Sequence, residues 1–166
     1  MPDDRSFLAA TYTDLAQADG DYATLRRLYE EFGAPLEFDA VTIGHKASGE
    51  ARFHSGRQET WSLAAGLAAA LLPSVGADAP SSLMAQRAVL CAVAGEVGRA
   101  LGRRDLMVLG SHVDESPAAL LVAAKAEHGS RIRDALHHAR SVLVRSADVD
   151  LDLIRRTAAA IGAIRP

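Results

Sequence analysis

The sequence contains a single cysteine, Cys91, so an intramolecular disulfide is excluded. Such sparing use of cysteine fits a reducing compartment. The first residues, MPDDRSFLAATYTDLAQADGD, are acidic and lack a basic stretch followed by a long apolar one. They do not read as a secretory signal. We therefore expect a cytoplasmic protein.

Features of several large functional classes are also missing. The net charge is -3 and aromatic residues make up 5% of the chain, which gives no basis for nucleic-acid binding. No Gly-x-Ser-x-Gly elbow, GxxxxGK[ST] loop or GxGxxG motif is present. Cys91 lies in the apolar run AVLCAVAG, where an unreactive buried thiol is expected. The sequence predicts a non-enzymatic protein without a cofactor.

What is present is a globular composition and a regular alternation of elements. The 166 residues, 49% of them hydrophobic, suit a single domain over 1–166. Hydrophobic periodicity predicts a strand, a helix and a β-hairpin, then a helical insert at about 60–102, then strand, helix, strand and helix. Asp19 or Asp21 is expected to cap the first helix, and Asp150 the last. This βαββ, insert, βαβα order predicts an α+β protein with a ferredoxin-like sheet that carries its helices on one face.

The hairpin also bears on metal binding. A turn at Ser48 and Gly49 would place Ile43 opposite His54, so that His45 and His54 share one face. Two histidines on adjacent strands suit a metal, but a third ligand is not evident, and the chain has no second cysteine. We therefore expect no metal site.

Three segments resemble a known family. They are FDAVTIGHKASGEARFH, RQETWSLAAGLAAALLPSV and DLMVLGSHVDESPAALLVAAK. Together they are similar to family 1269 of the bacterial domains of unknown function, over roughly residues 6–147. The resemblance implies a Gly/Ala-rich hydrophobic centre flanked by β-α-β units, and it carries over no reaction. A bacterial source also fits the use of sixteen arginines and only two lysines.

The Gly/Ala-rich centre includes an uncharged stretch, Thr60 to Ala77. Pro73 and Gly76 shorten its helical part to about 12 residues, roughly 18 Å, which is too short to span a bilayer. The next helix, about 82–101, carries Arg87, Glu96 and Arg99, which are costly inside a membrane. We predict a helical hairpin without membrane insertion; peripheral contact with a membrane stays open.

The first helix of this hairpin has no polar face, so it must be covered by other polypeptide. In the second helix, Glu96 and Arg99 are expected on the side away from the apolar stripe. Glycine inside a helix costs up to about 1 kcal/mol, so repeated glycines suggest close helix packing. Either the hairpin packs only within its own chain, or it also forms a homo-oligomer. The predicted interface residues are Trp61, Gly66, Ala70, Gly95, Gly98 and Gly102.

A second candidate site lies beside the hairpin. His54, Arg57, Trp61 and Arg87 combine a lone tryptophan with cationic groups, and an arginine that is partly buried needs a carboxylate or a ligand anion. The alternative is a structural ion pair of Arg87 with Glu59 or Asp78. The segment HVDES, residues 112–116, groups a histidine, two acids and a serine, but adjacent residues rarely form a catalytic triad. Its place before Pro117 predicts a loop.

The leading hypothesis is a cytoplasmic protein that self-associates through its helical hairpin. The alternatives are a sensor for a small ligand or anion at the site around His54, Trp61 and Arg87, and an enzyme of unrecognised type.

Overall fold

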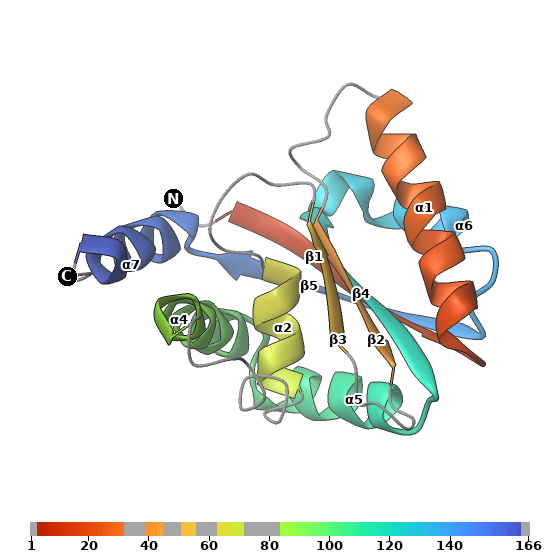
Figure 1. The fold of residues 1–166 in the computed structure, drawn as a ribbon, viewed down its shortest axis with the longest axis horizontal. Helices are drawn as coiled ribbons and strands as arrows, with labels where there is room; N and C mark the ends of the chain where they lie inside the picture. The colour runs from red at the N-terminus through yellow and green to blue at the C-terminus, as the bar shows by residue number, and fades with distance from the viewer. Residues whose placement is uncertain (1–2, 32–38, 45–50, 56–62, 72–83, 164–166) are drawn as a thin grey trace.

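The computed structural model describes residues 3–31, 39–44, 51–55, 63–71 and 84–163. Within these ranges the elements are β1 (Asp3–Tyr12), α1 (Leu15–Glu31), β2 (Asp39–Gly44), β3 (Ala51–Ser55), α2 (Leu63–Leu71), α4 (Met84–Leu101), α5 (Arg103–Asp114), β4 (Ala118–Lys125), the 3₁₀ turn η3 (Ala126–His128), α6 (Gly129–Ala135), β5 (Ser141–Val149) and α7 (Leu151–Ala163). The predicted order of strands and helices, including the hairpin, is confirmed (Figure 1).

The strands of the described residues form one antiparallel sheet in the order β3-β2-β4-β1-β5. The crossover through α1 joins β1 to β2, and the crossover through α6 joins β4 to β5. In each case one strand lies between the two that are joined. These interleaved β-α-β units confirm the α+β class and agree with a ferredoxin-like sheet. The strand β3 extends it at one edge.

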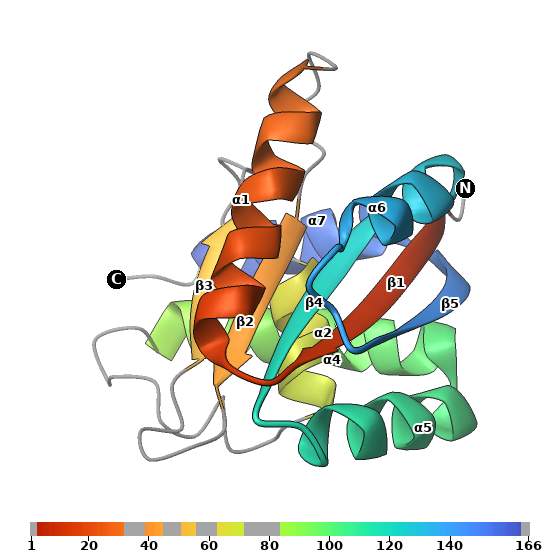
Figure 2. The same cartoon turned by 90° about the vertical axis from the view of Figure 1, so that its right-hand side faces the viewer.

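Side chains of the central strands divide between two cores, because successive residues of a strand point to opposite faces. On β1, Leu8, Ala10 and Tyr12 belong to one core, which α1 and α6 cover. Phe7 and Ala9 belong to the other, with residues of α2, α4 and α5. Figure 2 looks onto the α1 and α6 face of the sheet.

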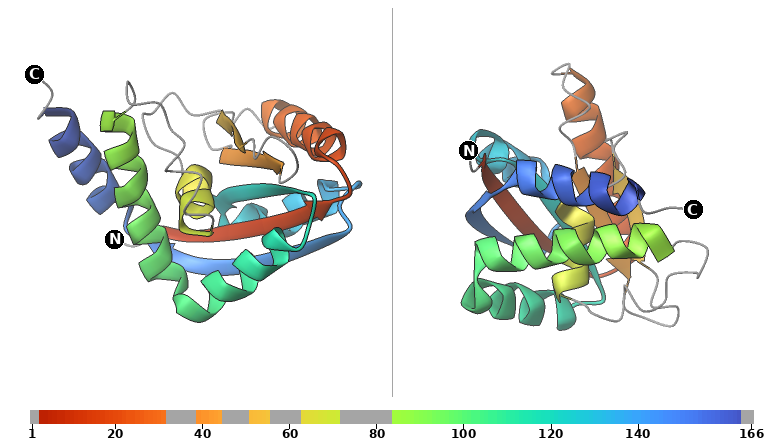
Figure 3. Two further views of the ribbon diagram at one scale, coloured as in Figure 1. Left: turned by 60° about the horizontal axis from the view of Figure 1, so that its bottom comes forward. Right: turned by 90° about the vertical axis from the view of Figure 1, so that its left-hand side faces the viewer.

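The expectation of helices on one face is therefore wrong. The two crossover helices share a face, but the helical insert covers the opposite one, giving three layers (Figure 3). The physical reason lies in β4, where Ala118 to Ala124 are all buried. A strand that is apolar on both faces has to be covered on both faces.

The uncharged helix α2 is covered by this same arrangement. Leu63, Ala64, Leu67 and Ala68 are at most 1% exposed, between the sheet and α4. The carboxylate of Asp39 on β2 accepts hydrogen bonds from the amides of Leu63 (2.7 Å) and Ala64 (3.3 Å), so it caps the helix. The side of α2 that packs on the sheet and α4 is thus buried by its own chain.

Several local predictions need correction. The helix α1 begins at Leu15, where Asp14 accepts a hydrogen bond from the Gln17 amide (2.9 Å), and not after Asp19 or Asp21. The helix α5 continues to Asp114, so His112 to Asp114 are helical and not part of a loop. The predicted cap at the last helix is confirmed, because Asp150 accepts a hydrogen bond from the Leu153 amide (2.9 Å).

The register of the hairpin also differs. Ala51 pairs with Ile43, and His54 pairs with Ala40, so the expected pairing of Ile43 with His54 is wrong. The connection between the strands is longer than a turn centred on Ser48 and Gly49 would allow. His45 and that turn lie outside the described residues.

A buried polar cluster joins α1 to the sheet. The Asp21 carboxylate, fully buried, accepts a hydrogen bond from the Tyr12 hydroxyl (2.8 Å) on β1. It also accepts one from the His138 amide (3.1 Å) and lies 2.8 Å from His138 Nδ1, in the connection from α6 to β5. One carboxylate therefore links three segments that are distant in sequence.

This cluster predicts a loss of stability at alkaline pH. Burial raises the pKa of the Tyr12 hydroxyl above its ordinary 10.0, and the hydrogen bond to Asp21 raises it further. The folded state thus holds this proton more tightly than the unfolded state. The resulting stability is complete below pH 10 and declines above it, by up to about 1.4 kcal/mol per pH unit. Urea denaturation between pH 9 and 11 should show this decline in the wild type, and Tyr12→Phe should lack that component. Equal declines in the two proteins would contradict the assignment.

Candidate functional site

The residues of the predicted ligand site are largely outside the described part of the chain. Arg57 and Trp61 lie in 56–62, which is not described. His54 lies on β3 and Arg87 in the first turn of α4, but the positions of their side chains are not among the described features. Glu59 and Asp78 are likewise outside. The ligand or anion site stays a prediction.

The predicted interface residues fall into two groups. Gly66 is buried and faces Val93 of α4, and Ala70 is half-buried on the same helix. Gly95 is exposed, and Gly98 and Gly102 are half-buried, on the outer side of α4 and at its end. Gly66 therefore serves close packing of α2 on α4 within the chain, whereas the glycines of α4 lie at or near the surface.

Glu96 departs from its predicted place on the far side of α4. It is 6% exposed, and its carboxylate binds the Arg99 guanidinium and accepts a hydrogen bond from the Asp150 amide (3.2 Å). The Arg99 contact lowers the pKa of Glu96, against the effect of burial, and the Asp150 bond adds to the lowering. Glu96 thus fixes α4 to the start of α7. The sequence predicts Asp150 as a helix cap, but no local spacing relates Asp150 to Glu96, because the two residues are 54 positions apart. The burial of Glu96 was therefore not predictable from the helical pattern of α4.

The outer face of α4, defined here as Cys91, Gly95, Gly98 and Gly102, is a stripe of small side chains. Cys91 is exposed on this face, so the expectation of a buried thiol is wrong. The spacing of four and three residues keeps Cys91, Gly95 and Gly98 on one side of the helix, and Gly102 directly follows its last residue. Figure 3 shows α4 between α7 and α5 in the layer that faces away from the sheet. The exposed large hydrophobic side chains of the described residues are Met107 and Val108 on α5 and Leu153 on α7. All three therefore lie on the helices that flank the stripe.

The backbone conformation explains one of these glycines. Gly102, between α4 and α5, has a φ of +85°, a conformation that favours glycine. A Cβ at Gly98 would stand 3.4 Å from Leu106 Cδ1, an ordinary van der Waals contact that does not require glycine. At Gly95, none of the described residues lies within 4 Å of where a Cβ would stand. Packing among the described residues gives no reason for glycine at that position.

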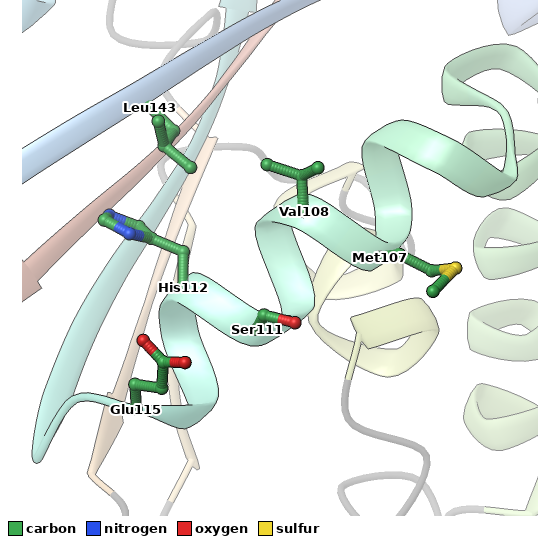
Figure 4. A pocket seen from close by; sticks show the side chains of 6 residues that line it. All are labelled: Met107, Val108, Ser111, His112, Glu115 and Leu143. Carbon is green, nitrogen blue, oxygen red and sulfur yellow. The ribbon is translucent and has the colours of Figure 1, made fainter.

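A second surface feature lies between α5 and β5. Met107, Val108, Ser111, His112 and Glu115 line a groove of about 450 Å³ together with Leu143. The groove is shallow and open to solvent. In Figure 4, Val108 and His112 extend toward Leu143, with Glu115 beside His112. The α5–β5 groove thus has an apolar part, at Val108 and Leu143, and a polar end, at His112 and Glu115.

His112, at the polar end, contacts a serine that sequence patterns do not single out. The Ser141 hydroxyl lies 2.9 Å from His112 Nε2 and 3.0 Å from the Thr11 hydroxyl. Further along, the Arg145 guanidinium binds the Asp105 carboxylate (3.2 Å). These two contacts tie α5 to β5 so that the helix and the strand run alongside each other in opposite directions.

A serine beside a histidine raises the question of nucleophilic catalysis. Such a mechanism requires a third group that orients the histidine, and donors aimed at the developing oxyanion. Among the described residues, no carboxylate is hydrogen-bonded to His112. The geometry supports a structural link between α5 and β5.

Comparison with models of protein families, with curated proteins and with solved structures found no match in any of the three. The resemblance to family 1269 therefore stays a prediction. Among the described residues, no helix is both long and apolar enough to cross a membrane.

Proposed function

We propose that the protein is a non-enzymatic interaction protein that self-associates, with a second copy packed against the outer face of α4. The observation that supports this most directly is Gly95. It lies within a helix, is exposed, and has no neighbour among the described residues of its own chain that would exclude a side chain. Glycine there costs up to about 1 kcal/mol relative to alanine. Unlike Gly20 of α1, Gly95 stands in a row of small side chains, the pattern that allows a second helix to approach closely.

The surroundings of Gly95 fit such contact. A stripe without large side chains lets a second helix approach closely, and the flanking Leu153 and Met107, 41% and 63% exposed, would then be partly removed from water. The interface proposed here is narrower than the whole hairpin, because the side of α2 that carries Leu63, Ala64, Leu67 and Ala68 is buried within the chain. Gly66 acts inside the subunit and not between subunits.

Substitution of Gly95 by leucine tests the proposal. In Gly95→Leu the new side chain holds the second helix away, so light scattering at micromolar concentration should show an oligomer for the wild type and a monomer for the variant. The variant should fold, since leucine favours a helix and the space is open. Gly20→Leu is the matched control, because Gly20 of α1 is also exposed within a helix and has nothing within 4 Å. The proposal would be contradicted if the wild type were a monomer, or if the Gly95→Leu variant formed the same oligomer as the wild type.

A further inference from the structure

The strand β5 lies at an edge of the sheet, and β1 is the strand that pairs with it. The backbone groups on the other side of an edge strand have no partner in the sheet, which makes such a strand a template for an added one. The Arg145 guanidinium donates a hydrogen bond to the Val144 carbonyl (2.8 Å). The Val144 carbonyl therefore accepts a hydrogen bond from a side chain. An incoming strand can displace this side chain and donate to the carbonyl instead.

The α5–β5 groove lies along this edge. A helix of 12 residues, such as α5, is about 18 Å long, which corresponds to five or six residues of extended chain. The apolar side chains of Val108 and Leu143 line the groove, so they offer a place for alternate apolar side chains of an extended peptide. The shape and the free edge favour a strand over a compact ligand.

The charged residues at the two ends of α5 indicate which charges a bound peptide should carry at its own ends. Arg103 and Arg104 are exposed at the start of the helix, and Asp114 and Glu115 are exposed at its end. The N-terminus of a helix carries a partial positive charge and its C-terminus a partial negative one, so acidic residues at the start and basic residues at the end stabilise a helix. The charged residues of α5 have the opposite order. Asp105, in the first turn, is bound to Arg145 and offsets the arginines only in part. Helix stability thus gives no reason for the order, but complementarity to a ligand with opposite charges does.

We propose that the α5–β5 groove binds an extended peptide as an added strand on β5, with a basic side chain beside Glu115 and an acidic side chain beside Arg104. The residues between them alternate, with apolar side chains directed into the groove. This inference goes beyond self-association, which is proposed for the outer face of α4, and different variants test the two proposals.

Two synthetic peptides, each of seven residues and blocked at both termini, test the charge pattern by fluorescence anisotropy. The first has lysine at one end, alternating valine and threonine, and aspartate at the other end; the second has aspartate at both ends. The wild type should bind the first about fivefold more tightly, as surface ion pairs allow. Glu115→Lys should reverse the preference. Because the peptide can bind in either direction, two acidic ends are a better control than reversed ends.

A second pair of variants tests the location. Val108→Lys places a charge in the apolar part of the groove and should weaken binding of the first peptide about tenfold or more. Ala23→Lys is the control, because Ala23 is exposed on α1, across the sheet from both the groove and the outer face of α4, and it should leave the affinity unchanged. All of these positions are exposed, so circular dichroism should show unaltered folds.

Three results of the peptide measurements would overturn the proposal. They are no binding of either peptide up to millimolar protein, equal binding of both peptides, and unchanged binding by Val108→Lys. A groove occupied by a second copy would be seen differently, as a lower mass of Val108→Lys in light scattering together with no peptide binding, and this too would overturn it. Failure of Gly95→Leu to change the mass would leave the peptide result intact.

Discussion

Gly66→Ala is expected to destabilise the protein by about 2 kcal/mol, although alanine is the better helix former. The Cβ atom would overlap Val93 Cγ1 and stand 3.1 Å from Val93 Cβ and 3.2 Å from its backbone carbon. Val93 is 1% exposed, and a branched side chain on a helix has little freedom to turn away. The helices α2 and α4 would have to separate, which also disturbs the Asp39 cap. Urea denaturation followed by circular dichroism measures the change.

Two further variants assign this effect to the contact. Val93→Ala alone removes buried atoms and should cost about 2 kcal/mol, but together with Gly66→Ala it makes room for the new methyl group. The double variant should therefore be more stable than the sum of the two single changes by at least about 1 kcal/mol. Gly20→Ala, on the exposed side of α1, should stabilise the protein by up to about 1 kcal/mol. If Gly66→Ala behaved like Gly20→Ala, the close approach of α2 to α4 would be disproved.

The elements of this fold could be predicted where a local pattern determines them. The apolar run of β4, the alternating strands of the hairpin and the Asp150 cap each depend on neighbours within a few residues. The order of such elements was enough to indicate two β-α-β units. The register of β2 and β3 was not predictable in this way, because Ser48 and Gly49 suggested a tight turn while the two strands end further apart.

The position of the helical insert required more than local pattern. A helix without a polar face must be covered, but the sequence of Thr60 to Leu72 does not say whether a sheet of the same chain or a second copy covers it. The sequence of β4 carried the missing information. Seven consecutive apolar residues in a central strand imply cover on both faces, and the insert was the remaining unit long enough to provide it.

Contacts across long separations account for what was missed at the surface. His112 and Ser141 meet because β5 pairs with β1 and α5 follows the same edge; they are 29 residues apart, so no short motif joins them. The sequence pattern favours Asp19 or Asp21 as the helix cap because acidic residues are common at that position. The capping pattern lies earlier, at Asp14 and Gln17, which leaves Asp21 in the second turn with its side chain turned inward.

Asp21→Ala should have the other large effect, a loss of about 3 to 4 kcal/mol in the free energy of unfolding. Its carboxylate is 0% exposed and is the acceptor for the Tyr12 hydroxyl and the His138 amide. Removal leaves the buried Tyr12 hydroxyl without an acceptor and releases the connection from α6 to β5. Asp134→Ala, at an exposed position of α6, is the matched control and should stay within about 0.5 kcal/mol of the wild type.

The hydrogen bond between Tyr12 and Asp21 can be tested separately from the general effect of removing a buried acid. Tyr12→Phe deletes the hydroxyl that Asp21 accepts from, so in the double variant Tyr12→Phe/Asp21→Ala no buried hydroxyl is left without an acceptor. The double variant should lose less than the sum of the two single changes, by about 1 kcal/mol or more, if the bond exists as described. Additive losses in urea denaturation would mean that Asp21 acts through His138 alone. A cost for Asp21→Ala no larger than that of Asp134→Ala would show that the carboxylate does not link α1 to β1 and to the strand β5 that follows His138.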